Sequence, residues 1–125
     1  MALSTFKCLI SILFLTLLVT KGSCEVCNLN NITIGTIRTG RVIQGKSEWK
    51  VIVVNNCSCA QSHIRLSCQG FQSVENVSPS IFSKSGDSCL LINGNLLKAK
   101  GTITFTYAWD PPFLMFPLSS IIGPC

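Results

Sequence analysis

Two cysteines separated by a single serine, Cys57 and Cys59, lie near His63 and Cys68, so that four potential zinc ligands fall within twelve residues. Structural zinc sites usually space the cysteines of one pair about two to four residues apart, and this pair does not match that spacing. Small secreted proteins rich in cysteine are more often cross-linked by disulfides. We therefore assign the cysteines to disulfide bonds and expect no metal and no other cofactor.

The first 24 residues have the three-part layout of a secretory signal peptide. Lys7 supplies a positive charge, a 13-residue, almost wholly apolar run covers positions 8–20, and small residues follow at 22–24. The run is too short to cross a bilayer comfortably. We expect residues 1–24 to be removed, and residues 25–125 to form a single secreted, extracellular domain with no membrane insertion.

Cleavage after residue 24 leaves an even number of cysteines, which suits three bridges in an oxidising compartment. The six are Cys27, Cys57, Cys59, Cys68, Cys89 and Cys125. If a hairpin turn holds Cys57 and Cys59, Cys68 lies about nine residues, or roughly 30 Å of strand, from that turn. Bridged Cα atoms lie within about 7 Å of each other, and Cys57 and Cys59 are poorly placed to bridge each other. Each of these three cysteines then pairs with Cys27, Cys89 or Cys125, which leaves six of the fifteen connectivities open.

Beyond residue 25, apolar and polar residues alternate between Gly, Pro and Asn, a pattern that predicts short strands. The expected strands cover residues 32–34, 41–43, 49–54, 63–68, 90–92, 96–97 and 102–109. Asn93-Gly94 should be the tight turn of a hairpin between residues 90–92 and 96–97, because both residues tolerate positive φ. Six or seven short strands in about a hundred residues predict an all-β fold, a compact β-sandwich stapled by disulfides.

The same alternation predicts which side chains face the core. Ile64, Leu66 and Cys68 share one face of their strand, with His63 and its alternating neighbours on the other. In residues 102–109 the side chains expected to point inward are Ile103, Phe105, Tyr107 and Trp109.

The ionisable residues indicate no catalytic site. The acids Glu25, Glu48, Glu75, Asp87 and Asp110 are each isolated in the sequence, whereas hydrolysis by paired carboxylates needs two acids at one bond. No strand–turn–helix elbow presents a serine to His63, which we interpret as a surface residue beside a turn. We expect no enzyme activity. Residues 25–125 carry eight Lys and Arg against five Asp and Glu, a charge too mild and dispersed for nucleic-acid binding.

Three asparagines occupy N-glycosylation sequons: Asn31, Asn56 and Asn76. Oxidation of Cys57 competes with glycosylation of Asn56, and Pro79 follows the sequon of Asn76. Asn31 is therefore the preferred acceptor.

The segment at residues 111–117 is the first candidate for a partner-binding surface. It places three prolines around Phe113, Leu114, Met115 and Phe116, and proline cannot donate in the ladder of a central strand. The segment should be a stiff loop or an edge. In an extended segment at most half of these side chains point inward, and the others form an exposed apolar patch. Alternatively, the segment crosses the open end of the sandwich and buries all four. The next candidate surface is the basic loop that carries Arg38, Arg41 and Lys46.

Several segments together resemble a known family. They are Asn55-Asn56-Cys57-Ser58-Cys59-Ala60-Gln61, Leu66-Ser67-Cys68-Gln69-Gly70-Phe71-Gln72-Ser73, Val77-Ser78-Pro79, Cys89-Leu90 with Asn93-Gly94, and Phe105-Thr106-Tyr107-Ala108-Trp109. The chain is similar, from Cys27 to Cys125, to the small secreted tapetum-determinant-like proteins of plants. The resemblance implies an extracellular protein ligand, whose partner is the ectodomain of a leucine-rich-repeat receptor kinase that fixes cell fate in the anther. The expected location is the apoplast.

The chain departs from the best-known members of that family in two places. Only one residue separates Cys57 from Cys59, fewer than in those members, and Trp109-Asp110-Pro111-Pro112 follows the Tyr-Ala pair. It looks closer to a divergent branch that is often labelled as a sugar transferase, a label that the missing acidic and nucleotide-sugar machinery contradicts.

Two other functions fit parts of the sequence. A wall-associated, non-catalytic polysaccharide-binding module would expose a flat row of Trp or Tyr, for which Trp49 is the plausible platform. A cationic defence protein would need more charge, or an amphipathic helix.

Overall fold

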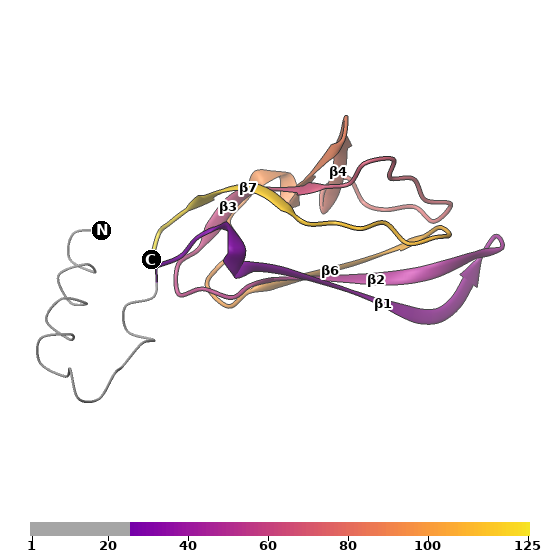
Figure 1. The fold of residues 1–125 in the computed structure, drawn as a ribbon, viewed down its shortest axis with the longest axis horizontal. Coiled ribbons are helices and arrows are strands. Elements are labelled where there is room, and N and C mark those ends of the chain that lie inside the picture. The colour runs from indigo at the N-terminus through magenta and orange to yellow at the C-terminus, as the bar shows by residue number, and fades with distance from the viewer. Residues whose placement is uncertain (1–25) are drawn as a thin grey trace, which may run out of the picture.

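The computed structural model describes residues 26–125, which fold into two antiparallel sheets stacked as two layers (Figure 1). The three-stranded sheet has the order β1-β2-β6, with β1 at Ile32–Ile43, β2 at Lys46–Asn55 and β6 at Thr102–Ala108. The four-stranded sheet has the order β4-β5-β3-β7, with β4 at Phe82–Ser85, β5 at Ser88–Leu91, β3 at Gln61–Ser67 and β7 at Pro117–Ile122. Two 3-10 turns, η2 (Leu29–Asn31) and η3 (Ile92–Gly94), complete the elements of this part of the chain. The all-β sandwich is confirmed.

The core lies between the layers and follows the predicted alternation. Ile64 and Leu66 of β3, and Cys68 just beyond it, are fully buried in one core cluster with Val51 and Val53 of β2. From β6 the inward side chains are Ile103, Phe105 and Tyr107. Trp109 differs from its prediction: it lies just beyond β6 and is only partly buried at the margin of the core. Among residues 26–125 no helix has the length and apolar character needed to span a membrane.

β1 is one long strand where the sequence predicted two short ones. Its pairing with β2 runs from Ile32 to Ile43 and is interrupted only by a bulge between Arg38 and Val42. Gly40 sits inside this bulge with a φ of 95°, a value that L-residues rarely adopt. Glycines at 35 and 40 look like strand breakers in the sequence, but here they lie within a strand whose hydrogen bonds to β2 continue on both sides.

The predicted hairpin around Asn93-Gly94 is wrong. Both residues do have positive φ, but they belong to η3, and the chain does not fold back onto β5. Leu97 instead forms a bridge with Gln61 of β3. The hairpin partner of β5 is β4, which is joined to it through Gly86.

Neither β4 nor β7 was predicted. β4 has four residues, of which only Phe82 is buried. β7 begins at Pro117 and is the outer strand of its sheet, a position where the missing amide donor is tolerated.

Candidate interaction surface

The segment at residues 111–116 connects β6 to β7 and distributes its large side chains to two sides. Met115 is buried, and Phe113 packs against the core with its ring centroid 5.3 Å from that of Phe71 and 5.8 Å from that of Tyr107. The Phe113 amide also donates to the Tyr107 hydroxyl at 2.8 Å. Leu114 and Phe116, in contrast, are 83% and 48% exposed. The alternative in which all four side chains are buried is therefore wrong.

Exposed apolar side chains continue from this segment into β7. We use the term apolar strip for the exposed side chains of Leu114, Phe116, Leu118, Ile121 and Ile122. Residues 111–125 contain no charged residue. β7 pairs with β3 alone among the strands of residues 26–125, so one edge of the strip carries backbone groups without a strand partner there. Long, uncharged, apolar edges of this kind are prone to associate with another chain.

A groove of about 390 Å³ lies beside the strip. It is lined by Ile34 and Thr36 of β1, Trp49 of β2, and residues 112–115. The groove therefore brings the edge of one sheet and the β6–β7 connection together on one side of the sandwich.

The three basic residues proposed from the sequence lie around the β1–β2 hairpin, and each has a partner. The Arg38 guanidinium lies 5.7 Å from the centroid of the Trp49 ring and donates to Ser47 Oγ at 2.6 Å. Lys46 Nζ lies 4.6 Å from the centroid of the Trp109 ring. Arg41 forms an ion pair with Glu48, with 3.5 Å between Nη1 and Oε2. These contacts order the cations, although Arg38 and Arg41 remain exposed.

The aromatic residues do not form an open platform on the described part of the chain. Trp49 is partly buried, lies under Arg38 and donates its Nε1 hydrogen to the Trp109 carbonyl at 2.9 Å. Tyr107 is fully buried, and burial raises the pKa of its hydroxyl. The row of exposed rings expected of a polysaccharide-binding module is therefore not found in residues 26–125.

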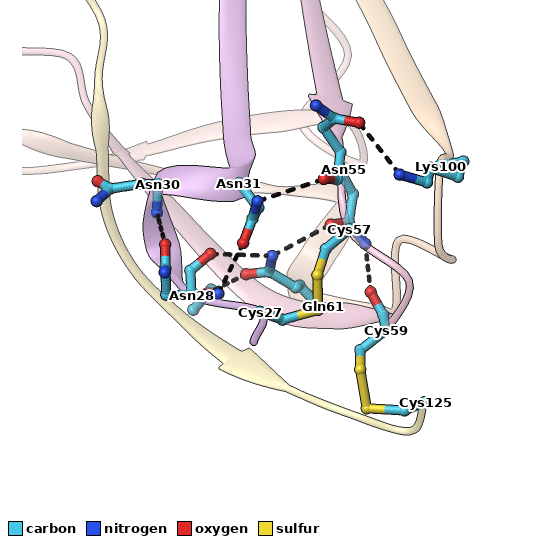
Figure 2. The surroundings of a disulfide bond; sticks show 12 residues. Cys27, Asn28, Asn30, Asn31, Asn55, Cys57, Cys59, Gln61, Lys100 and Cys125 are labelled. Carbon is cyan, nitrogen blue, oxygen red and sulfur yellow. Dashed lines mark hydrogen bonds between the residues drawn. A yellow bond between two sulfur atoms is a disulfide. The ribbon is translucent and has the colours of Figure 1, made fainter. Parts of the chain in front are cut away.

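Three disulfides link the six cysteines, as Cys27–Cys57, Cys59–Cys125 and Cys68–Cys89. This pairing is one of the six connectivities that the sequence left open. The first two bridges lie at the end of the sandwich where the described chain begins and where it terminates (Figures 1 and 2). The third joins the end of β3 to β5 inside the main core.

A buried polar network lies beside the first two bridges (Figure 2). The Asn55 amide group donates to the carbonyls of Cys59, Leu97 and Lys98, and its own Oδ1 accepts from Gln61 Nε2. Ser120 of β7 donates to Gln61 Oε1 at 2.6 Å. The network therefore joins β2 of one sheet to β3 and β7 of the other.

The three predicted glycan acceptors lie in different settings. Asn31 is the last residue of η2, and its Oδ1 accepts from the amide of the N-cap residue Asn28 at 2.8 Å. Asn56 is exposed, and its Oδ1 accepts from Lys100 Nζ at 3.3 Å. Asn76 is exposed on the β3–β4 loop. Their occupancy stays a prediction.

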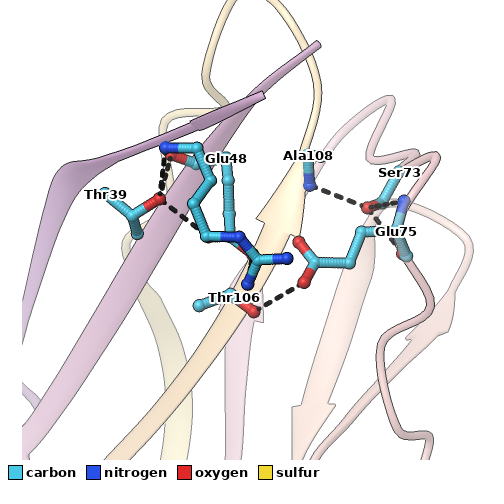
Figure 3. A network of polar contacts seen from close by, with 7 residues as sticks. Thr39, Glu48, Ser73, Glu75, Thr106 and Ala108 are labelled. Carbon is cyan, nitrogen blue, oxygen red and sulfur yellow. Dashed lines mark hydrogen bonds and ion pairs between the residues drawn. The ribbon is translucent and has the colours of Figure 1, made fainter. Parts of the chain in front are cut away.

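The structure brings together two acids that the sequence analysis treated as isolated. Glu48 of β2 and Glu75 of the β3–β4 loop meet on the outer face of the three-stranded sheet, beside Thr106 (Figure 3). Their separation in the sequence gave no signal for this contact. His63 is exposed, and its Nδ1 lies 3.1 Å from Ser62 Oγ. Residues 26–125 contain no group of three or more His, Cys, Asp or Glu side chains that could hold a metal ion.

A comparison with known protein families matches residues 28–123 to the model described as "Tapetum determinant 1, C-terminal". The chain belongs to the tapetum determinant 1 family. The match includes four of the six bridged cysteines, the buried polar network and the whole apolar strip.

Among curated proteins, the chain is 32% identical over 93 residues to "TPD1 protein homolog 1A" of rice, Oryza sativa subsp. japonica. The aligned region is 67% of this chain and 41% of the rice protein, so the chain spans less than half the length of that relative. No solved structure matches. The predicted leader at residues 1–24 lies outside the described residues.

Proposed function

We propose that this protein is a secreted, non-catalytic signalling ligand, which binds the ectodomain of a leucine-rich-repeat receptor kinase in the plant apoplast and acts in cell differentiation. Family membership and three disulfides, typical of proteins folded in oxidising compartments, support an extracellular role. The single observation that carries the proposal is the apolar strip.

The strip suits protein binding for two physical reasons. Apolar side chains that remain exposed on a folded secreted domain cost solubility, and such patches mark interaction sites more often than chance surface. The inward side chains Phe113 and Met115 also anchor the segment against the core. A partner would therefore meet Leu114 and Phe116 already held in place, and the entropy lost on binding would be smaller.

Co-purification with receptor ectodomains tests the proposal. The purified protein, after verification of its three disulfides, is passed over individually immobilised ectodomains of leucine-rich-repeat receptor kinases. We expect at least one ectodomain to retain the wild-type protein. The double variant Leu114→Ser/Phe116→Ser should bind that ectodomain about tenfold or more weakly, as expected for loss of interface hot spots, with an unchanged melting temperature.

Two controls separate binding from folding. Leu96→Ser removes a side chain that is 54% exposed and lies outside the strip, and should leave binding unchanged. Phe113→Ser/Met115→Ser removes core contacts and should lower the melting temperature. Wild-type affinity in the Leu114→Ser/Phe116→Ser protein would show that the contact surface lies elsewhere, with Arg38 and Arg41 the next residues to replace. Failure of every ectodomain to retain the wild-type protein would contradict the receptor-ligand function.

A further inference from the structure

Glu48 and Glu75 form a carboxyl pair that the proposed function does not use (Figure 3). The side chain of Glu48 is almost completely buried, at 2% exposure. Its Oε1 accepts from Thr39 Oγ1 at 2.7 Å, and Glu75 Oε2 accepts from Thr106 Oγ1 at 3.1 Å. Three strands and the β3–β4 loop, residues 68–81, therefore contribute to one polar cluster.

The backbone around Glu75 attaches this loop to the outer edge of β6. The Val74 amide donates to the Ala108 carbonyl at 3.0 Å, and the Ala108 amide donates to Ser73 Oγ at 2.9 Å. β6 is an edge strand of its sheet, so these two bonds cover its final residue. The loop also borders an open pocket of about 430 Å³, whose lining includes Phe71, Phe82 and Glu75.

The cluster is short of hydrogen-bond donors. Glu48 Oε2 and Glu75 Oε1 are both buried and accept no hydrogen bond, a costly state for carboxylate oxygens. One guanidinium, that of Arg41, lies 3.5 Å from Glu48 Oε2. A single proton on one carboxyl would remove one negative charge and supply a donor for the other group.

The surroundings of the two carboxyls favour the proton on Glu75. Burial, followed by the neighbouring Glu48 carboxyl, raises the pKa of Glu75. The hydrogen bond from Thr39, followed by the neighbouring Glu75 carboxyl, lowers the pKa of Glu48. Two lysines also lie nearby. The strand register places Lys50 opposite Thr106 on the same face, and Lys84 of β4 lines the open pocket together with Glu75 and donates to the Phe71 carbonyl.

We propose that the Glu48–Glu75 pair is a pH-dependent clamp, which holds the β3–β4 loop on the edge of β6 when it carries one proton and releases the loop when that proton is lost. The direction of this pH dependence follows from the linkage between proton binding and docking of the loop. A carboxyl whose pKa is higher when the loop is docked stabilises the docked state at pH values below its ordinary pKa, and this stabilisation disappears as the pH rises through the higher value. Release of the loop uncovers the end of β6. The inference does not depend on receptor binding.

Hydrogen exchange of two backbone amides tests the clamp directly. The amides of Val74 and Ala108 are protected only by the contacts between loop and strand. After correction for intrinsic exchange rates, their protection factors in the wild-type protein should fall between about pH 4 and about pH 8, by about tenfold for each pKa unit between the docked and released states. Amides at the centre of β2, near Val53, report global opening and should show no matching fall.

Three variants distinguish the clamp from a passive contact. Glu75→Gln keeps a neutral donor beside Glu48 and should show high, pH-independent protection at Val74 and Ala108. Glu75→Ala removes the pair and should show low protection at every pH. Asp87→Asn, at an exposed acid in the β4–β5 turn, should behave as the wild type. The proposal is overturned if wild-type protection of both amides does not change with pH, or if the pH response survives in the Glu75→Gln protein.

Discussion

Gln61 Nε2 donates to Asn55 Oδ1 at 3.1 Å inside the protein, and this bond joins the two sheets. Both side chains are fully buried. The amide nitrogen of Asn55 donates to backbone carbonyls, and Gln61 Oε1 accepts from Ser120. A buried polar network in which every group is paired favours a single arrangement of the elements around it. The network therefore fixes the relative position of β2, β3 and β7 at the end of the sandwich where the first two disulfides lie.

Replacing Asn55 with Ala should destabilise the fold strongly. The change removes the side-chain donor of the Cys59 carbonyl and the acceptor that Gln61 Nε2 uses at 3.1 Å, and an unsatisfied buried polar group costs about 1–3 kcal/mol. We expect urea unfolding to show a loss of at least that size. Asn30→Ala is the matched control, because Asn30 is exposed at the same end of the molecule, and it should change the free energy of unfolding by less than about 0.5 kcal/mol. Equal effects of the two changes would contradict the role of the network.

The three disulfides should differ in their response to a reducing agent. Cys68 and Cys89 are fully buried, whereas Cys125 is exposed at the end of the chain. Thiol exchange requires access to a sulfur atom, so the Cys59–Cys125 bridge should be reduced first and Cys68–Cys89 last. Partial reduction, alkylation and peptide mass analysis give the order. Early alkylation of Cys68 would show that the core opens before the terminal bridge is attacked.

The Cys68–Cys89 bridge should also be required for folding. Losing a native disulfide from a small secreted domain typically costs about 2–5 kcal/mol, which is a large part of the stability of a domain this size. Cys68→Ser/Cys89→Ser protein should fail to accumulate in secreted, folded form. Secretion at wild-type levels with an unchanged melting temperature would contradict this expectation.

The sequence predicted the parts of this fold that depend on local alternation. Leu66 and Tyr107 were assigned to the core because residues two apart share a face of a strand, and the structure places both there. The prediction of a hairpin at Asn93-Gly94 was wrong. Positive φ specifies a local bend, but it does not determine which strand the following residues pair with. Here the following residues pair with β3 through the bridge between Leu97 and Gln61, which is a tertiary contact.

The interaction surface could be predicted only in part. Proline at 111, 112 and 117 showed that the segment is not a central strand, but whether Leu114 points outward depends on the packing of Phe113 against Tyr107. The Glu48–Glu75 contact had no signal at all, because nothing in a single sequence indicates that the β3–β4 loop returns to the edge of β6.

Replacing Gly101 with Ala should lower stability more than the same change at Gly35. A Cβ at position 101 would lie 2.9 Å from both Leu97 Cδ1 and the Lys98 carbonyl oxygen, whereas a Cβ at position 35 would meet nothing within 4 Å. The backbone oxygen cannot move without disturbing the Gly101 amide, which donates to it. Thermal unfolding should show a lower melting temperature for Gly101→Ala, and no loss for Gly35→Ala. A stable Gly101→Ala protein would show that the turn before β6 can rearrange.

Acid should loosen the β1–β2 hairpin through Asp110. The backbone amide of Ser47, which donates to Asp110 Oδ2 at 3.0 Å, lowers the pKa of this carboxyl, and the charges of Arg38 and Lys46 act in the same direction. A carboxyl whose pKa is lower in the folded state stabilises it above the ordinary pKa, and this contribution is lost as the pH falls through the lower value. The NMR amide shift of Ser47 should therefore titrate below the ordinary aspartate range. In Asp110→Asn that titration should disappear, whereas Asp87→Asn should retain it. A Ser47 shift that follows the same curve in the wild-type and Asp110→Asn proteins would assign the acid response to another group.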